Sequence, residues 1–378
     1  HIKLRPGTNV AVLNMMLHFI IKSKLYNADF VRDRTEGFDN FLKEIERQDV
    51  DQLAKVAGVD KQLVKEAAIA YATARNSMEF HGLGVTEHEQ GSKTVMLIAD
   101  LAMITGNIGR KGVGVNPLRG QNNVQGAADM GCQPHQGAGY FPVDKTENQK
   151  FYTEKYGVTH PTKAGLKIPQ MFEAAINKEL KGLWIIGEDI VQTDPNSAHV
   201  IEAMNSLELL VVQEIFMSET AKLATVVLPG TTFLEKDGTF TNTERRIQRV
   251  NRAVPPLPGT KPDGLIVTEM MQKLGFDQPS YDADQVLEEI ADIVPFFKGV
   301  TRERLGKLGL QWPVKEDGSD TKILHTEEFK LGKGRLKNFD WKESSEIEAN
   351  QKDYPLILTT SRVLQHYNAA TMTRRTKN

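Results

Sequence analysis

Apolar residues recur along much of this chain at the spacing of an amphipathic helix. Between residues 9 and 23, Val10, Leu13, Leu17, Ile20 and Ile21 fall on one helical face. The same spacing predicts further helices over residues 60–75, about 91–105, 263–274 and 284–293.

The helix expected over residues 60–75 shows how such a segment should begin and pack. Asp60 precedes it, and an aspartate side chain accepts hydrogen bonds from the first free N–H groups of a helix. Either Thr8 or Asn9 is suited to the same role at the first helix. We expect Leu63, Val64, Ala67 and Ala70 to face the core.

Continuous apolar runs in the middle of the chain predict buried strands. The runs cover residues 183–186, 209–212 and 224–228, and helix-like segments at 196–205 and 218–222 separate them. This alternation is typical of a parallel sheet with helical crossovers. Ligands of such sheets lie beyond the carboxyl ends of the strands, which here are residues 187–193, 213–220 and 229–232.

Other stretches carry weaker patterns. Residues 78–83 predict a short strand that ends in a Gly-Leu-Gly sequence. From Gly106 to Tyr140 the chain contains nine glycines and many amides without periodicity, which predicts an ordered loop. The charged, glycine-containing stretch 315–350 is expected to be a connection.

Composition excludes several classes of protein. The 378 residues include 47 basic and 49 acidic side chains. The formal charge of -2 therefore lacks the excess of positive charge that is typical of nucleic-acid-binding proteins. No apolar run approaches the ~20 residues that span a bilayer, and direct membrane insertion is not expected. The single cysteine, Cys132, excludes an internal disulfide. A chain of this length predicts two or three domains.

Three motifs each allow two interpretations. Residues 106–114 resemble a glycine-rich phosphate loop, but they follow a predicted helix and lack a Gly-Lys-Ser/Thr sequence. His81, His88 and Glu89 would make a metal cluster, although solvated or hydrogen-bonded histidines are favoured. Cys132 would be a nucleophile or a metal ligand, although a structural thiol is favoured.

The segment 117–126 contains many side chains that can donate hydrogen bonds. Arg119 stands beside the amide side chains of residues 121–123 and Gln125, on a backbone flanked by glycines. A guanidinium group presents a planar fork that suits a carboxylate or another small oxyanion. The pattern is explained equally well by a loop that the amide side chains stabilise through hydrogen bonds, with Arg119 exposed to solvent. The polar run 235–246 indicates, by composition alone, a solvated turn.

Taken together, these segments resemble the catalytic subunit of molybdenum- or tungsten-dependent formate dehydrogenases in the dimethyl-sulfoxide-reductase superfamily. The long Arg119-centred motif is specific to formate dehydrogenases within that superfamily, and the other motifs mark the cofactor-binding fold. The matching segments are residues 2–8, 82–86, 105–110, 115–126, 187–189, 192–194, 213–218, 228–230, 236–246, 360–367 and 371–373.

The resemblance implies a molybdenum or tungsten ion held by two molybdopterin guanine dinucleotides and by a Cys or selenocysteine that a His follows. It also implies a 4Fe-4S cluster near one pterin. The cluster cysteines and the metal-binding pair are expected ahead of His1, and most of the last domain beyond Asn378. We therefore expect an internal fragment that is inactive alone, with no metal ligand within it and Cys132 outside the ligand position.

Residue by residue, Arg119 matches the arginine that orients formate beside the metal, which makes it the catalytic candidate. Asp263 matches an acidic residue that reads a guanine edge. Glu87 stands where some members carry Gln, so its contact is expected to change from amide to carboxylate. The remaining expected cofactor contacts are Gly84, Thr86, Gly120, Gln121, Gly187, Glu188, Asp189, Thr193, Gln213, Arg362, His366 and Asn368.

The implied fold is the α/β molybdopterin-oxidoreductase fold, in which Rossmann-like parallel sheets with flanking helices form two interleaved domains. We expect residues 1–121 to be part of the first cofactor-binding domain and residues 122–350 to form the second. Residues 351–378 are expected to begin a C-terminal pterin-binding β-barrel domain.

The implied reaction oxidises formate to carbon dioxide and passes two electrons through the metal and the cluster to an acceptor subunit or carrier. Two other functions stay open. One is another molybdopterin oxidoreductase, such as a nitrate-reductase-like enzyme, and the other is a non-catalytic assembly or scaffold subunit. A cytoplasmic location is expected because no feature of an exported protein is visible.

Overall fold

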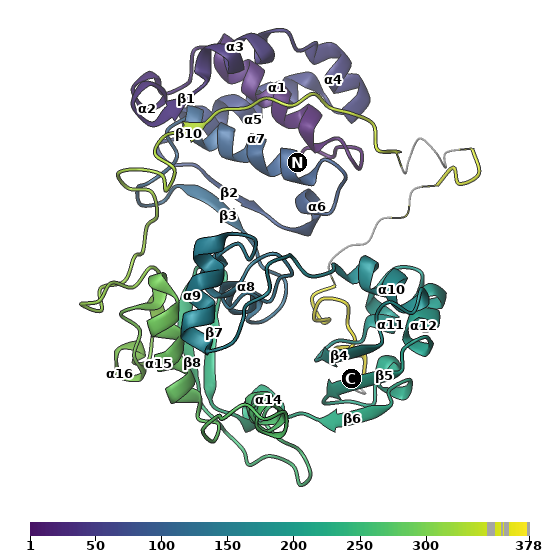
Figure 1. Cartoon of the computed structure of the whole chain (residues 1–378). Helices are drawn as coiled ribbons and strands as arrows, with labels where there is room; N and C mark the ends of the chain where they lie inside the picture. The colour runs from purple at the N-terminus through teal and green to yellow at the C-terminus, as the bar shows by residue number, and fades with distance from the viewer. Residues whose placement is uncertain (346–351, 357, 359–362, 376–378) are drawn as a thin grey trace. The chain divides into compact units, whose positions relative to one another are not determined.

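A computed structural model describes all residues except 346–351, 357, 359–362 and 376–378. The chain divides into two compact units (Figure 1). Unit 1 comprises His1–Leu118 and Ile323–Thr360, and unit 2 comprises Arg119–Lys322 and Ser361–Asn378.

Unit 1 is mainly helical. Its central helix α1 packs against α3, α4, α5 and α7, and its short strands pair in parallel, β2 with β3 and β1 with β10. The elements are α1 (Asn9–Lys22), α2 (Ala28–Arg34), β1 (Thr35–Glu36), α3 (Phe38–Glu46), α4 (Val50–Ala57), α5 (Lys61–Thr73), β2 (Met78–His81), α6 (Leu83–Thr86), α7 (Gly91–Ile104), β3 (Gly114–Pro117) and β10 (Gly334–Arg335).

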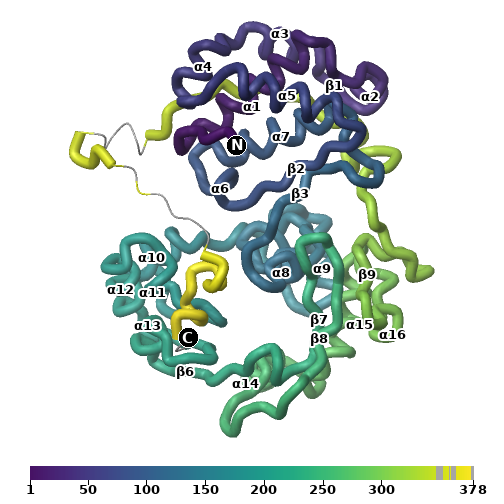
Figure 2. The backbone as a smooth tube through the Cα atoms, turned by 180° about the vertical axis from the view of Figure 1, so that it is seen from behind, coloured from purple at the N-terminus to yellow at the C-terminus, as the bar shows by residue number. Residues whose placement is uncertain are grey.

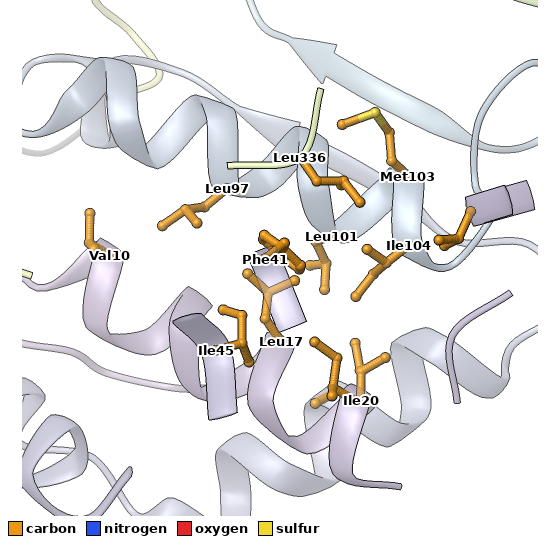
Figure 3. Close-up of a cluster of buried hydrophobic side chains, with 13 residues drawn as sticks. Val10, Leu17, Ile20, Phe41, Ile45, Leu97, Leu101, Met103, Ile104 and Leu336 are labelled. Carbon is orange, nitrogen blue, oxygen red and sulfur yellow. The ribbon is translucent and has the colours of Figure 1, made fainter. Parts of the chain in front are cut away.

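The core of unit 1 lies between α1, α3 and α7 (Figure 3). Leu17, Ile20, Leu97 and Ile104 each have 0% of their surface exposed, and burying such a side chain stabilises the fold by roughly 1.5–3 kcal/mol. Leu336 reaches this core from the distant end of the chain. Its burial is one reason why residues near 336 belong to unit 1.

The helix prediction for residues 60–75 is confirmed, but its buried face differs from the expected one. Asp60 caps α5 by accepting a hydrogen bond from the Gln62 N–H. Val64 and Ala68 are buried, whereas Leu63 is 37% exposed and Ala70 is exposed. The narrow buried stripe leaves the flanking positions in solvent, so the inward assignment of Leu63 and Ala70 was wrong.

The stretch 106–140 contains more regular structure than a loop. Residues 114–117 form β3, which pairs in parallel with β2 over the register Met78↔Gly114 to His81↔Pro117. Residues 124–129 form the helix α8. The expected strand 78–83 ends at His81, because the chain turns at Gly82 into the short helix α6.

Unit 2 contains the predicted parallel sheet, with strand order β4-β5-β6. In its core, apolar residues of β4 and β5 pack against apolar residues of α10 and α12. Examples are Leu210 and Val212 of β5 and Val200 and Ala203 of α12. The elements of this part are α8 (Val124–Asp129), η1 (Ala138–Tyr140), α9 (Thr146–Tyr156), α10 (Ile168–Ile176), β4 (Gly182–Ile186), α11 (Ile190–Thr193), α12 (Ser197–Asn205), β5 (Leu209–Glu214), α13 (Glu219–Lys222) and β6 (Val226–Pro229).

The rest of unit 2 includes an antiparallel sheet of β7, β8 and β9. The polar run 235–246 is therefore the first strand and the turn of a hairpin, and not only a solvated turn. The elements are η2 (Phe233–Glu235), β7 (Gly238–Thr241), β8 (Arg246–Val250), α14 (Asp263–Lys273), α15 (Ala283–Ile293), η3 (Pro295–Phe297), α16 (Arg302–Leu305), β9 (Leu310–Gln311) and η4 (Thr373–Arg375).

The predicted domain boundaries at residues 121 and 350 follow the family resemblance and stay predictions. Within the described residues 315–345, the two-residue strand β10 is the only regular element of more than one residue. The rest of this stretch is irregular, as expected of a connection between elements. Over the described residues, no helix combines the length and the apolar character needed to cross a membrane.

Candidate cofactor site

The carboxyl ends of β4, β5 and β6 lie at one edge of the sheet in unit 2. Ile186 is in register with Gln213, and Glu214 with Pro229. The N–H of Gly187 donates to the Gln213 carbonyl at 2.9 Å, and Gly187 has a φ of +67°. An added Cβ at Gly187 would meet nothing within 4 Å. Gly187 thus provides a turn with open space beyond the end of β4.

Asp189 is 4% exposed and ties this turn to α13. Its Oδ1 atom accepts hydrogen bonds from the N–H and the hydroxyl of Thr220, at 3.0 and 2.8 Å. The guanidinium of Arg375 lies 3.6 Å from its Oδ2 atom. The Thr193 hydroxyl donates to the Asp189 carbonyl at 3.2 Å. The Asp189 carboxylate therefore stabilises the loop, and the side chain of the preceding residue, Glu188, is exposed.

Gln213 and Asp263 meet at the end of β5. The Gln213 side chain is 1% exposed, and its Nε2 atom donates to Asp263 Oδ1 at 2.7 Å. Lys236 forms an ion pair with Asp263 Oδ2. Gln213 Oε1 and Thr231 Oγ1 are buried and lack a hydrogen-bond partner among the described residues. Two buried, unsatisfied polar atoms near this strand edge, one of them on the amide that contacts Asp263, are suited to a polar ligand.

Space is available next to Asp263. Lys236, Asp263, Gly264, Tyr281 and Asn123 line part of a cavity of about 250 Å³. Gly264 is required there, because an added Cβ would lie 2.2 Å from the Tyr281 ring. The cavity is therefore lined both by Asp263, which contacts Gln213 of β5, and by Asn123 of the segment that carries Arg119.

The Arg119 segment is held on the β7–β8 hairpin. The Arg119 N–H donates to Thr243 Oγ1 at 3.1 Å, and the Thr241 N–H donates to Asn123 Oδ1 at 2.9 Å. Arg119 and Gln121 are exposed. In the part of the chain that the structure describes, no carboxylate lies within ion-pairing distance of the Arg119 guanidinium. The motif thus combines a fixed backbone with an available cation.

The described C-terminal residues also contact this segment. Figure 2 shows them beside α11 and α13. Tyr367 accepts a hydrogen bond from the Asn122 N–H, and an added Cβ at Gly120 would lie 3.1 Å from Asn368 Oδ1. His366 Nδ1 lies 3.1 Å from Thr373 Oγ1. Gly120 and Asn368 are therefore neighbours, while Arg362 lies outside the described residues.

Three expected contact residues, Gly84, Thr86 and Glu87, belong to unit 1. They lie on or directly after α6, and all three are exposed. The Thr86 hydroxyl donates to the Gly82 carbonyl at 3.4 Å, within its own helical turn. Their cofactor role stays a prediction.

Two residues that border the site were not expected from the sequence, Thr231 and Tyr367. Thr231 falls within the strand-end segment 229–232, so the topology rule indicated its location but not its side chain. Tyr367 belongs to a matching segment, yet nothing in the sequence indicated its contact with Asn122.

The metal alternatives find no support in the described structure. It contains no group of three or more His, Cys, Asp or Glu side chains arranged to hold a metal ion. His81 is buried, which lowers its pKa. Glu89 accepts hydrogen bonds from the N–H and hydroxyl of Ser345. Gly109 packs against the His325 backbone, so residues 106–114 are a packed turn.

Comparison with known proteins identifies related sequences over the whole chain. Residues 1–273 match the family model described as molybdopterin oxidoreductase. The F420-dependent formate dehydrogenase subunit alpha of Methanocaldococcus jannaschii is 43% identical over 381 residues, covering 100% of this chain and 56% of the relative. Formate dehydrogenase H of Escherichia coli is 38% identical over 379 residues, covering 99% of this chain and 53% of the relative.

A solved structure shares the fold. Acetylene hydratase from Pelobacter acetylenicus superposes with a TM-score of 0.64 at 19% identity, over 94% of this chain and 53% of that protein. At this identity the likeness concerns the fold alone. The chain thus spans about half the length of the relatives that it matches.

Proposed function

Because the chain belongs to the molybdopterin oxidoreductase family, we propose that it is the cofactor-binding part of a formate dehydrogenase α subunit. The reaction is the oxidation of formate to carbon dioxide with release of one proton and two electrons. The single observation that carries this proposal is the likeness to two formate dehydrogenases, at 43% and 38% identity over essentially the whole chain.

The family implies a molybdenum or tungsten pterin cofactor, and the residues at the sheet edge fit such a group. Gln213 Oε1 and Thr231 Oγ1 are buried without a partner in the described structure, and the turn at Gly187 leaves open space. Asp263 presents its carboxylate beside a cavity of about 250 Å³. A carboxylate accepts hydrogen bonds from adjacent N–H donors, as a guanine edge offers, and this supports the guanine dinucleotide form.

When bound, the cofactor supplies the two-electron chemistry, and the chain supplies binding and orientation. Arg119 is the residue that we assign to formate. Its guanidinium is exposed and its backbone is anchored to Thr243. A planar fork of N–H donors holds a carboxylate in one orientation, which positions its C–H bond for reaction.

The remaining assignments rest on the resemblance. We assign Gly84, Thr86 and Glu87 of unit 1 to cofactor contacts. We also assign Gly120, Gln121, His366 and Asn368 of unit 2 to cofactor contacts. Glu188, Asp189 and Thr193 contribute the loop that follows β4. A 4Fe-4S cluster outside this chain would carry the electrons onward, and the relative's designation as subunit alpha supports an acceptor subunit. A cytoplasmic location stays a prediction.

The test is formate-dependent reduction of a viologen dye by the full-length protein under anaerobic conditions. Molybdenum and tungsten are quantified on the same sample. We expect dye reduction with about one metal ion per chain, since the two pterins are expected to share one ion.

The other outcomes separate the remaining functions. Metal without formate oxidation would contradict the substrate assignment and favour another molybdopterin oxidoreductase. A protein with neither metal nor activity, prepared from a host that loads related enzymes, would favour a scaffold subunit.

A further inference from the structure

Asp129 is a fully buried carboxylate that the function proposed above does not use. It is 0% exposed and lies on α8, the helix that directly follows the Arg119 segment. Its Oδ1 atom accepts hydrogen bonds from Gln125 Nε2 at 2.9 Å and from the Tyr140 hydroxyl at 2.7 Å. Its Oδ2 atom accepts one from Trp312 Nε1 at 2.9 Å. We call these four residues the Asp129 network.

The Asp129 network is closed on itself. Gln125 Nε2 also donates to the Tyr140 hydroxyl oxygen at 2.9 Å, so this hydroxyl accepts one hydrogen bond and donates another. Every partner of Asp129 is a donor, which suits an ionised carboxylate. Burial raises the pKa of Asp129, while these donors and the positive charge of Arg119 oppose that rise. A buried charge persists only where such compensation exists.

One connection from Asp129 to Arg119 runs along α8. The helix begins after Asn123, which has a φ of +59° and accepts the Thr241 N–H. An added Cβ at Gly126 would lie 2.2 Å from Asn123 Oδ1, so the glycine leaves room for this side chain. Anchoring α8 at Asp129 therefore fixes where the Arg119 segment ends.

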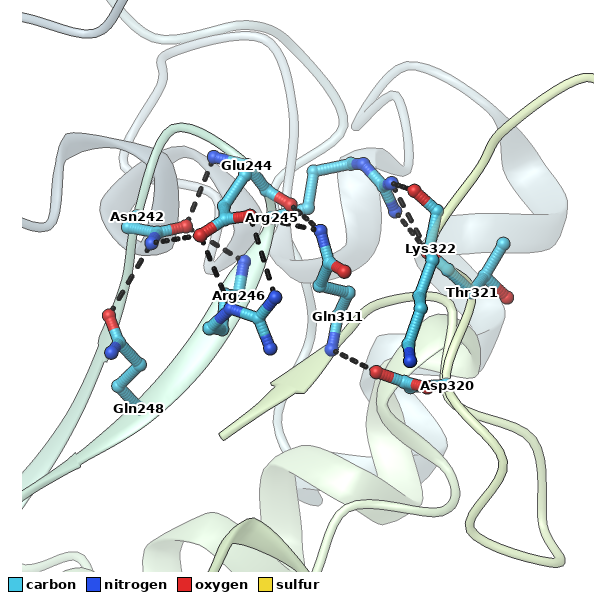
Figure 4. A network of polar contacts seen from close by, with 9 residues as sticks. All are labelled: Asn242, Glu244, Arg245, Arg246, Gln248, Gln311, Asp320, Thr321 and Lys322. Carbon is cyan, nitrogen blue, oxygen red and sulfur yellow. Dashed lines mark hydrogen bonds and ion pairs between the residues drawn. The ribbon is translucent and has the colours of Figure 1, made fainter. Parts of the chain in front are cut away.

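A second connection runs through Trp312 and the turn of the β7–β8 hairpin. The Trp312 N–H donates to the Arg245 carbonyl at 3.0 Å, and the Arg245 guanidinium lies 5.4 Å from the Trp312 ring centroid. The same guanidinium donates to the Trp312 carbonyl. It also donates to the Thr321 carbonyl (Figure 4). Arg245 is thereby held from both its backbone and its side chain.

The hairpin turn that contains Arg245 also contacts the backbone of Arg119. Asn242 Oδ1 accepts the N–H groups of Glu244 and Arg246, both at 3.0 Å (Figure 4). Thr243, between these positions, accepts the Arg119 N–H at 3.1 Å. Trp312 thus joins the Asp129 carboxylate to the turn that receives the Arg119 backbone.

We infer that Asp129 is a positioning residue for Arg119: its carboxylate joins α8 to the hairpin turn, and these two elements hold the Arg119 backbone from both sides. This inference rests on the proposed function, in which Arg119 binds formate. Asp129 itself is remote from solvent and acts only through the segment that it orders.

The test uses three variants of the full-length protein. Asp129→Asn keeps the shape but replaces one acceptor oxygen by a donor, so at least one of the three donors loses its partner. Trp312→Phe removes the indole N–H that donates to Asp129 and also shortens the ring that packs against Arg245 and Phe296, while Asp129 itself is kept. Asp292→Asn is the matched control, because Asp292 is an exposed carboxylate of unit 2 that pairs with Lys155.

Two readouts are needed. The first is hydrogen exchange of the amides of residues 119–123, with the amides of α1 as an internal reference. In Asp129→Asn we expect exchange at 119–123 to accelerate by at least roughly tenfold, since loss of a buried partner destabilises locally. The second is formate kinetics: kcat/KM should fall roughly tenfold with metal content kept, because a misplaced guanidinium both binds and orients formate less well.

The outcomes decide between the inference and a general effect on stability. Faster exchange at 119–123 in Asp129→Asn and, to a smaller extent, in Trp312→Phe supports the inference, provided that Asp292→Asn behaves as the parent. Unchanged exchange and unchanged kcat/KM with metal retained would overturn it. If Asp129→Asn does not fold, Trp312→Phe decides alone. If the parent holds metal but does not oxidise formate, the proposed function fails, and exchange still decides the role of Asp129.

Discussion

The Nε2 atom of Gln213 lies 2.7 Å from the Oδ1 atom of Asp263, although 50 residues separate them in the sequence. Gln213 is the penultimate residue of the parallel strand β5, and Asp263 begins α14. The contact brings a strand-end amide and a helix-start carboxylate to one place, with Lys236 on the other carboxylate oxygen. This cluster is the centre of the proposed nucleotide site.

Replacing Asp263 by alanine should reduce the retention of molybdenum or tungsten by the full-length protein. The substitution removes the acceptor that we assign to the guanine edge, and a hydrogen bond to a charged group contributes about 1.5–3 kcal/mol. Affinity for the cofactor should fall roughly tenfold or more. Metal per chain is measured after purification, and Asp277→Ala, at an exposed position of the same unit, is the control. Equal metal content in both variants would remove Asp263 from the site.

Replacing Arg119 by lysine should lower formate turnover at least roughly tenfold, or ~1.4 kcal/mol, because an ammonium group cannot make the bidentate contact. Steady-state viologen reduction measures the effect, with metal content determined on the same samples. Arg110→Lys is a matched control, since Arg110 lies in unit 1 and donates to Asn107. Near-parental turnover of Arg119→Lys with metal retained would contradict the role of Arg119.

The parts of the fold that the sequence predicted well have strong local signals. β4, β5 and β6 are continuous apolar runs bounded by glycine or polar residues, and helical segments separate them, so their type and their parallel arrangement follow from the pattern. The strand-end rule then selected Gln213 and the turn at Gly187 without any knowledge of their neighbours.

The missed elements lack such signals. β3 has the sequence Gly-Val-Asn-Pro and is a strand because β2 offers it a hydrogen-bonding edge. In α5 the apolar pattern predicted a helix correctly, but which positions are buried depends on how α1 packs against it. The contact of Asn122 with Tyr367 joins residues 245 positions apart, and periodicity contains no information at that range.

Stability of unit 1 should depend on pH through Asp100, a residue of α7. Asp100 is 2% exposed, its Oδ2 atom has no partner among the described residues, and burial raises its pKa from 3.8 to about 8. A raised pKa means that the folded state binds the proton more tightly than the unfolded state. Stability is therefore lost as the pH rises from about 4 to about 8, by up to ~1.4 kcal/mol per pH unit.

Asp100→Asn removes this titration while keeping the side-chain shape. Between pH 5 and pH 9, the variant should lose less protection of its α7 amides than the parent, as measured by hydrogen exchange corrected for the intrinsic rate at each pH. Asp39→Asn, an exposed position of the same unit, serves as the control. A parallel pH response of parent and Asp100→Asn would show that Asp100 does not titrate in this range.

Leu336 should be the residue that holds the returning segment on unit 1. Its side chain is 6% exposed and packs in the core with Phe41, Leu101 and Met103 (Figure 3). Truncation of a buried leucine to alanine typically costs 2–5 kcal/mol, because the cavity collapses only partly. Leu336→Ala should therefore increase hydrogen exchange of the β1 and β10 amides strongly, and that of α1 and α7 to a smaller extent.

The same segment provides a matched control, because Leu331 is 81% exposed. Leu331→Ala makes the same chemical change without opening a cavity, and its exchange should equal that of the parent within error. If the two variants exchange alike, the segment is held by its backbone pairing of Thr35 with Gly334 and Glu36 with Arg335. The predicted difference instead assigns that role to one apolar side chain, since two paired residues are too few to hold a strand in water.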